Sequence, residues 1–131
     1  ETPTSTFGNE LAPSVTFIKL SSNALIGSLP SEVSHLPDLA SIQLHDNSLS
    51  GTIPPALFTL QRLHTIFLND NELEGGLPYV EMPNLKNLDL SENSLEGSLP
   101  TFLLSDLVYL RLSRNRFVGT IPDSYGSLQN L

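Results

Sequence analysis

The 131-residue sequence contains no cysteine, and only six lysine and arginine residues stand against 14 aspartate and glutamate residues. The lack of cysteine excludes disulfides, thiolate metal sites and cysteine nucleophiles. The formal net charge of -8 opposes binding to nucleic acid and to anionic membranes, and would attract basic partners. No apolar run approaches the roughly 20 residues that cross a bilayer. We therefore expect no nucleic-acid partner and no membrane insertion by this segment.

The motifs of catalysis are missing as well. The sequence has no phosphate-binding loop, no nucleophile turn with serine, histidine and aspartate partners, and no stripe of basic and aromatic residues. No asparagine begins an Asn-x-Ser/Thr glycosylation sequon. We therefore expect neither an enzyme nor a cofactor. The 39% of hydrophobic residues nevertheless suffice to bury a core, which predicts a folded chain.

What the sequence does contain is an internal repeat. The same pattern, apolar-x-x-apolar-x-Leu-x-x-Asn, occurs five times, and its asparagines are spaced by 24, 24, 22 and 22 residues. The asparagines are Asn23, Asn47, Asn71, Asn93 and Asn115. The alternation of apolar and polar residues before each one predicts a short strand with one buried face. One strand per repeat predicts a parallel sheet, in which successive coils stack their leucines into one continuous core.

Each asparagine is followed by a second shared segment. A short amide at the bend after a strand can satisfy backbone groups of neighbouring turns, so we interpret the asparagines as structural. Beyond them comes Leu-x-Gly-x-Leu-Pro or a close variant, such as residues 49–54 and 95–100. Glycine permits a bend and proline ends hydrogen-bonded pairing, so the chain is predicted to turn there onto the opposite face.

The combined pattern L-x-x-L-x-L-x-x-N-x-L-x-G-x-[IL]-P resembles the plant-specific class of leucine-rich repeats, and the resemblance covers residues 15–131. It implies an α/β-type solenoid, a right-handed superhelix with one inner parallel β-sheet, short second strands, and short 3-10 or helical turns outside. Members of this class commonly serve as ectodomains of receptor-like kinases and receptor-like proteins, or as polygalacturonase-inhibiting proteins. The resemblance therefore implies ligand recognition on the inner face and an extracellular or cell-surface location.

The repeats divide the chain into segments. Residues 1–14 are expected to form a frayed lead-in or a weak N-terminal cap. Five repeats follow at 15–38, 39–62, 63–84, 85–106 and 107–127, and residues 128–131 begin a sixth. The third and fourth repeats are shorter on the outer side, where we expect an irregular convex face. Because a solenoid needs terminal units with polar outer faces, we expect the fuller protein to continue in both directions.

Function is expected among the strand residues that point to solvent between the buried leucines. Phe17, Phe67 and Tyr109 are exposed aromatics in this prediction, and aromatic anchors dominate the energy of many interfaces. The alternative interpretation is scattered surface apolar residues, which are normal. The three are predicted to form a row with about 10 Å between neighbours. The other candidate ligand-binding residues are Lys19, Gln43, His45, Asp46, Asp70, Asp89, Glu92, Arg111 and Arg114.

Several of these candidates are charged. Asp46, Asp70 and Glu92 are predicted to form a ladder of carboxylates in steps of about 5 Å, with Asp89 beside it and two arginines at one end. Its interpretations are a solvated acidic face or a strip that binds a basic peptide. Calcium binding is disfavoured because a flat ladder supplies too few oxygens, and glycosidase chemistry is disfavoured because an exposed sheet cannot raise a carboxyl pKa. His45 and His64 lack a third ligand, so no metal site is predicted.

Three hypotheses about function remain open. The first is a module that binds a protein or peptide, or else a glycan, along the inner face of a receptor-like ectodomain. The second is an inhibitor of a cell-wall-degrading enzyme. The third and weakest is binding to ice or to a polysaccharide surface through the regularly spaced hydroxyls of Ser28, Thr52, Ser98 and Thr120, a series that Gly76 interrupts.

Overall fold

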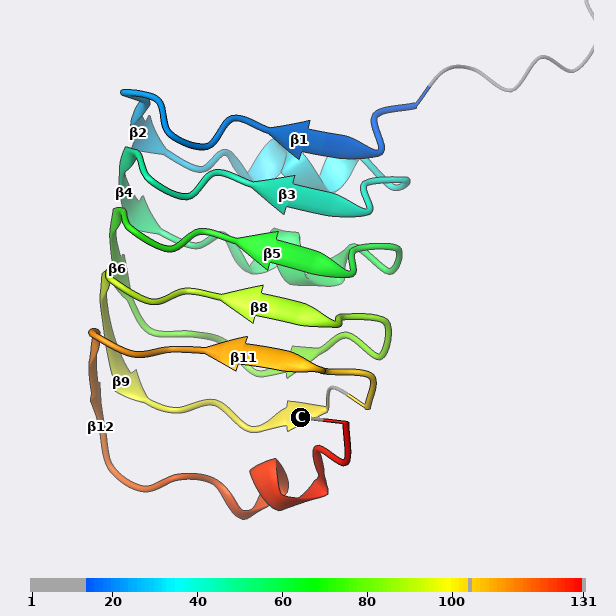
Figure 1. Cartoon of the computed structure of the whole chain (residues 1–131), viewed down its shortest axis with the longest axis vertical. Coiled ribbons are helices and arrows are strands. Elements are labelled where there is room, and N and C mark those ends of the chain that lie inside the picture. The colour runs from blue at the N-terminus through cyan, green and yellow to red at the C-terminus, as the bar shows by residue number, and fades with distance from the viewer. Residues whose placement is uncertain (1–13, 104, 131) are drawn as a thin grey trace, which may run out of the picture.

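The computed structural model describes residues 14–103 and 105–130, and it shows a solenoid of stacked coils (Figure 1). Each coil gives one strand to a parallel inner sheet with the order β1-β3-β5-β8-β11. These strands are β1 (Phe17–Lys19), β3 (Ser41–Gln43), β5 (Thr65–Phe67), β8 (Asn87–Asp89) and β11 (Tyr109–Arg111). The predicted inner parallel sheet is confirmed. Residues 1–13 of the expected lead-in (1–14) and residue 131 of the expected start of a sixth repeat (128–131) lie outside the described residues.

A second parallel sheet runs along one side of the solenoid, in the order β12-β9-β6-β4-β2. Its strands are β2 (Ile26–Ser28), β4 (Ser48–Thr52), β6 (Glu72–Gly75), β9 (Ser94–Ser98) and β12 (Arg116–Val118). The short second strands are therefore confirmed. The glycine of each Leu-x-Gly segment has a positive φ, as in Gly75 at 81°, and a Cβ on Gly75 would lie 2.9 Å from Thr52 Cγ2. Both the backbone conformation and the close approach of the neighbouring coil explain why glycine stands there.

The outer side of the coils differs with repeat length. Three longer coils form 3-10 helices: η1 (Ser31–His35), η2 (Pro55–Thr59) and η3 (Asp123–Ser127). The irregular convex face expected in the two shorter repeats is wrong, because β7 (Val80–Glu81) and β10 (Phe102–Leu103) form a two-stranded parallel sheet there. A strand rises about 3.3 Å per residue and a 3-10 helix only about 2.0 Å, so fewer residues span the same coil when extended. Because the two short repeats are neighbours, their extended segments pair.

The core is complete only in the middle of the stack. At the position that ends each apolar pattern, Leu20 is 48% exposed in the first coil, whereas Leu44 is 7% and Leu68 and Leu90 are 0% exposed. Each interior leucine is covered by the coil before it and the coil after it. Burial therefore depends on stacking, as expected for a solenoid whose coils are not stable alone.

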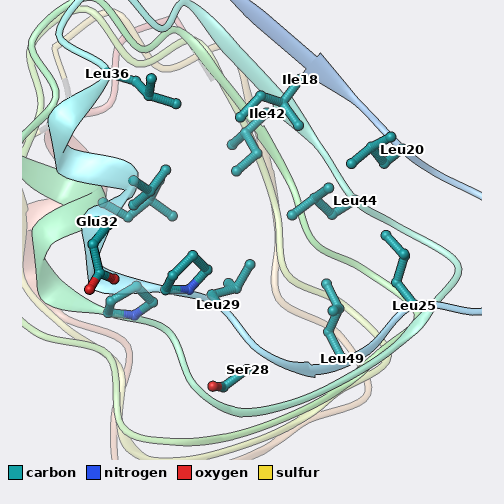
Figure 2. A pocket seen from close by; sticks show the side chains of 14 residues that line it. Ile18, Leu20, Leu25, Ser28, Leu29, Glu32, Leu36, Ile42, Leu44 and Leu49 are labelled. Carbon is teal, nitrogen blue, oxygen red and sulfur yellow. The ribbon is translucent and has the colours of Figure 1, made fainter.

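An apolar cavity of about 380 Å³ lies within the first two coils. Figure 2 shows Ile18, Leu25, Leu29 and Leu36 pointing from around the coil into this space, with Glu32 at its edge. Ile18, Leu25, Leu29 and Leu36 are only partly buried and pack against the main core from one end. The first coil is therefore packed less tightly than the middle coils.

The asparagines hold neighbouring coils together. Asn71 Nδ2 donates to the carbonyl of Leu44 in the previous coil at 3.0 Å, and its Oδ1 accepts the N–H of Leu49 at 2.9 Å. The same pair of contacts with the previous coil is made by Asn47, Asn93 and Asn115. Among the residues that the structure describes, Asn23 bonds to the carbonyls of Leu20 and Ser21 in its own turn. The predicted structural role of the asparagines is confirmed.

Candidate functional site

The candidate site is a depression of about 380 Å³ on the inner sheet, at the middle coils. We call it the inner-face pocket, and it is lined by Gln43, His45, Phe67, Asn69, Asn87, Asp89 and Tyr109. Strands β3, β5, β8 and β11, which lie side by side in Figure 1, carry most of these residues, and the turns after β3 and β5 carry the others. Because the strands are parallel and in register, polar and aromatic residues of different coils meet at one place.

Aromatic rings form one wall of the pocket. The Phe67 ring lies edge-to-face against Tyr109, with centroids 6.4 Å apart and an interplanar angle of 74°, and it contacts His45 in the same way at 6.1 Å. The expected 10 Å row is wrong for this pair. Phe67 of β5 pairs with Asp89 and Tyr109 of β11 pairs with Asn87, so the two rings approach diagonally over β8. Long aromatic side chains reach such diagonal neighbours, and edge-to-face is a favourable arrangement for them.

Asp89 is the floor of the pocket. It was expected to face solvent, but it is only 6% exposed, so this expectation is wrong. Its Oδ1 accepts the N–H of Ser91 at 3.0 Å and the hydroxyl of Ser91 at 2.6 Å, and its Oδ2 accepts the Tyr109 hydroxyl at 3.2 Å. The short carboxylate lies beneath the longer side chains of the neighbouring strands.

Other short side chains of the inner sheet are covered in the same way. Ser41 and Thr65 are buried, although their positions between the apolar residues predict exposure. Gln43 Nε2 donates to Ser41 Oγ at 3.1 Å, and Asn87 Nδ2 donates to Thr65 Oγ1 at 3.2 Å. The alternation of the strand therefore predicts which face a residue is on, whereas the length of its neighbours decides its exposure.

The remaining candidates lie outside the pocket. Phe17 and Lys19 lie on β1, where the Lys19 ammonium is 5.6 Å from the Phe17 ring centroid. Arg111 is exposed on β11 and is the register partner of Asp89. Asn69 and Asn87 are pocket residues that the selection of candidates missed, although both stand at inner-face positions of the repeat. Their place in the pocket depends on contacts between neighbouring coils, which the sequence of one repeat does not show.

The carboxylate ladder is a row of residues with an unusual backbone. Asp46, Asp70 and Glu92 have φ values of 58°, 55° and 55°, and Ser22 and Arg114 at the same repeat position have φ of 54° and 55°. This left-handed conformation is uncommon for residues other than glycine, and aspartate tolerates it better than most. Glu92 also forms a surface ion pair with Arg114 at 3.1 Å. The turn before each asparagine therefore constrains the backbone of the ladder residues, whose side chains are also available to a ligand.

This constraint gives a stability prediction at Asp70. Asp70→Gly is expected to leave the free energy of unfolding unchanged or to raise it by up to about 1 kcal/mol, because glycine adopts this φ without strain. Asp70→Val is expected to lower it by about 2 kcal/mol, since a β-branched residue is strained there. Urea unfolding measures both variants. Glu72→Val, at an exposed residue of β6, is the control, and an equal loss at both positions contradicts the strain argument.

The predicted hydroxyl ladder is not formed in the second sheet. Ser28 is the register partner of Ser50, Thr52 is the partner of Glu74, and Ser98 is the partner of Val118. Equivalent residues of successive coils are therefore offset along the strands. A periodic surface such as ice would meet a mixture of side chains across each pair of strands and no straight row of hydroxyls.

The part of the chain that the structure describes holds no group of three or more histidine, aspartate or glutamate side chains placed to bind a metal ion. His64 Nδ1 lies 3.0 Å from Thr65 Oγ1, and His35 lies in η1 on the outer side. Within the same described ranges, no helix has the length and apolar character needed to span a membrane.

Sequence comparison agrees with the geometry of the coils. A family model described as Leucine Rich Repeat matches residues 38–60, 84–105 and 106–128, which together make up just over half of the chain. The chain belongs to the leucine-rich repeat family. No curated protein matches the sequence.

Solved structures of leucine-rich repeat ectodomains are similar to this chain. The ectodomain of the Arabidopsis thaliana membrane receptor kinase GASSHO1/SCHENGEN3, in complex with CASPARIAN STRIP INTEGRITY FACTOR 2, is 36% identical with a TM-score of 0.81 over 87% of this chain. The Arabidopsis receptor kinase HAESA, in complex with the peptide hormone IDA and the co-receptor SERK1, is 36% identical with a TM-score of 0.79 over 83% of this chain. The complex PEPR1-AtPEP1 is 36% identical with a TM-score of 0.84 over 89% of this chain.

This leucine-rich repeat segment spans only a small part of those structures. It covers 14% of the GASSHO1/SCHENGEN3 chain, 19% of the HAESA chain and 17% of the PEPR1 complex chain. The similarity therefore concerns a few coils of a longer solenoid.

Proposed function

We propose that this leucine-rich repeat segment recognises a protein or peptide ligand through its inner sheet, as part of an extracellular or cell-surface receptor ectodomain, and that it catalyses no reaction. The observation that carries the proposal is the inner-face pocket, in which aromatic, amide and carboxylate side chains of four coils meet. The similar HAESA structure is a complex with a peptide hormone, which supports a peptide as the ligand.

The pocket has the composition of a recognition site. Tyr109 is 40% exposed and its ring is already held by Phe67, so it offers apolar area to a ligand with little further loss of side-chain freedom. Aromatic residues held in this way are common energetic centres of interfaces. The amides of Gln43, Asn69 and Asn87 surround the rings and can hydrogen-bond to the backbone of an extended peptide.

The charge distribution favours a basic ligand over an acidic one. Asp46 and Asp70 are exposed beside the pocket, and the formal charge of the whole chain is -8. Such a field raises the rate at which oppositely charged partners meet the surface. No observation on the inner sheet favours inhibition of a cell-wall-degrading enzyme, and the offset hydroxyls give no support to binding of ice.

The inner-face proposal is tested with peptides selected from a random phage-displayed dodecapeptide library on the immobilised chain. The double variant Phe67→Ala with Asp70→Ala is expected to weaken the selected peptides at least tenfold, because it removes the ring that holds Tyr109 and an adjacent charge. Isothermal titration calorimetry measures the affinities.

The matched control is Tyr79→Ala with Glu81→Ala, which removes an aromatic ring and a carboxylate from exposed positions on the outer side. It is expected to change the affinity less than twofold, with circular dichroism verifying the fold of both variants. Equal binding to the inner-face variant and to the unchanged chain would show that ligands use another surface. A glycan array and an inhibition assay on polygalacturonase cover the two other ligand classes.

A further inference from the structure

The buried carboxylate of Asp89 has no cationic partner within the described part of the chain. Its hydrogen bonds come from the Ser91 N–H, the Ser91 hydroxyl and the Tyr109 hydroxyl, which are all neutral donors. The ion pairs that the described residues form join Arg62 to Asp38 and Arg114 to Glu92. A buried carboxylate is costly unless it is hydrogen-bonded and, in most proteins, paired with a cation. Asp89 is hydrogen-bonded, but no cation of the described residues pairs with it.

The cationic residue beside Asp89 in the strand register is Arg111 on β11. Its side chain is exposed, it does not line the pocket, and it makes no ion pair with Asp89 in the structure. The Tyr109 hydroxyl, from the same strand, occupies Oδ2 instead. A carboxylate can accept about four hydrogen bonds. Asp89 accepts three hydrogen bonds from the described residues, so it retains acceptor capacity, and it lines the pocket.

The walls of the pocket also suit a cation. The Phe67 and Tyr109 rings line it together with Asp89, and the faces of aromatic rings attract ammonium and guanidinium groups. His45 supplies an independent observation, since its Nδ1 is buried with no hydrogen-bond partner among the described residues. This nitrogen therefore leaves one hydrogen-bonding group in the lining of the pocket unsatisfied.

We infer that the inner-face pocket binds a basic side chain of the ligand, lysine or arginine, with Asp89 as its counter-ion and Phe67 and Tyr109 as its walls. This inference rests on the proposed function and names the kind of ligand residue that the site selects. A free amino terminus of a peptide carries similar chemistry, and the test distinguishes the two sources.

The test titrates the isotopically labelled chain with capped pentapeptides and follows the amide resonances of Phe67, Asn87 and Tyr109 by NMR. The probes are acetyl-Gly-Ser-Lys-Ser-Gly-amide, its arginine counterpart, and its norleucine counterpart, which keeps the apolar stem without the charge. A fourth probe, Gly-Ser-Nle-Ser-Gly-amide with a free amino terminus, carries only the terminal ammonium. The lysine and arginine probes are expected to give saturable shifts at millimolar concentration, at least fivefold tighter than either norleucine probe.

The variant that decides the question is Asp89→Asn, which keeps the size of the side chain and removes its charge. It is expected to weaken the lysine probe at least fivefold, whereas Glu72→Gln, which removes a carboxylate charge from an exposed position of β6 outside the pocket, weakens it less than twofold. Arg111→Gln is expected to strengthen binding of the lysine probe about twofold, because it removes a neighbouring positive charge that repels the lysine.

Equal losses in Asp89→Asn and Glu72→Gln would overturn the inference in favour of diffuse attraction. Equal binding of the acetylated norleucine probe would overturn it in favour of apolar contact, and preference for the free-terminus probe would replace the side chain by the ligand's amino terminus. If Asp89→Asn fails to fold, Tyr109→Leu and Phe67→Leu must each weaken the lysine probe. Should the selected peptides depend on Phe67 and Asp70 but not on Asp89, the inner-face proposal stands and this inference falls.

Discussion

Replacement of Asn71 by alanine is expected to lower the free energy of unfolding by about 2–3 kcal/mol. The amide of Asn71 bridges two coils, since Nδ2 donates to the Leu44 carbonyl and Oδ1 accepts the Leu49 N–H. Alanine leaves the Leu49 N–H without this acceptor at a part-buried position, whereas the Leu44 carbonyl still accepts from Asn47 Nδ2 at 3.0 Å. Leaving one buried polar group unsatisfied costs about 1–3 kcal/mol.

The chain offers a matched control for this variant in Asn23. Asn23 occupies the same repeat position, but its amide is exposed, and within the described ranges it bonds to the carbonyls of Leu20 and Ser21 in its own turn and to no other coil. Asn23→Ala is therefore expected to cost less than about 1 kcal/mol. Urea unfolding followed by far-ultraviolet circular dichroism measures both. Similar losses at the two positions would mean that the bridge between coils contributes little beyond the local turn.

The repeat pattern predicts the fold well because its apolar columns have a direct physical meaning. Residues such as Ile42, Ile66 and Leu88 alternate with polar residues, and the structure places all three in the core of one parallel sheet. The asparagines are predictable for the same reason, since a polar side chain between stacked coils must satisfy backbone groups. These features depend on each repeat resembling its neighbours.

The candidate site could be predicted only in part because it depends on differences between repeats. Sequence places Phe67, Asp89 and Tyr109 on the inner face, but the contact between the two rings arises from a diagonal offset across β8. The burial of Asp89 follows from the size of its neighbours, which the pattern of one strand does not contain. The positive φ of Asp46 and Asp70 could not be predicted from the repeat pattern. Several polar residue types tolerate this conformation, so no distinctive motif in the sequence indicates it.

The site depends on the regularity of the stack beneath it. Phe67 is the register partner of Asp89, and Asp89 is the register partner of Arg111. Residues far apart in the sequence therefore lie on neighbouring strands. The next residue after Phe67 is Leu68, which is fully buried and whose N–H donates to the Asp89 carbonyl at 2.9 Å. Packing in the core and geometry in the pocket are therefore linked through adjacent residues.

This link leads to a prediction at Leu68. Leu68→Ala is expected to lower the free energy of unfolding by about 3–4 kcal/mol, because it removes buried apolar surface and leaves a cavity between two complete coils. It is also expected to weaken the peptides selected on the inner sheet, since the backbone that holds Phe67 relaxes toward the cavity. Urea unfolding gives the first quantity and calorimetric titration the second.

The control is Leu20→Ala, the same substitution at the equivalent position of the first coil. Leu20 is 48% exposed and borders the apolar cavity of that coil, so its removal exposes little new surface and is expected to cost about 1 kcal/mol. A large difference between the two leucines is the signature of a solenoid in which each coil is stabilised by its neighbours. Equal losses would instead indicate that the first coil is packed as tightly as the third and that the stack does not depend on the position of a coil within it.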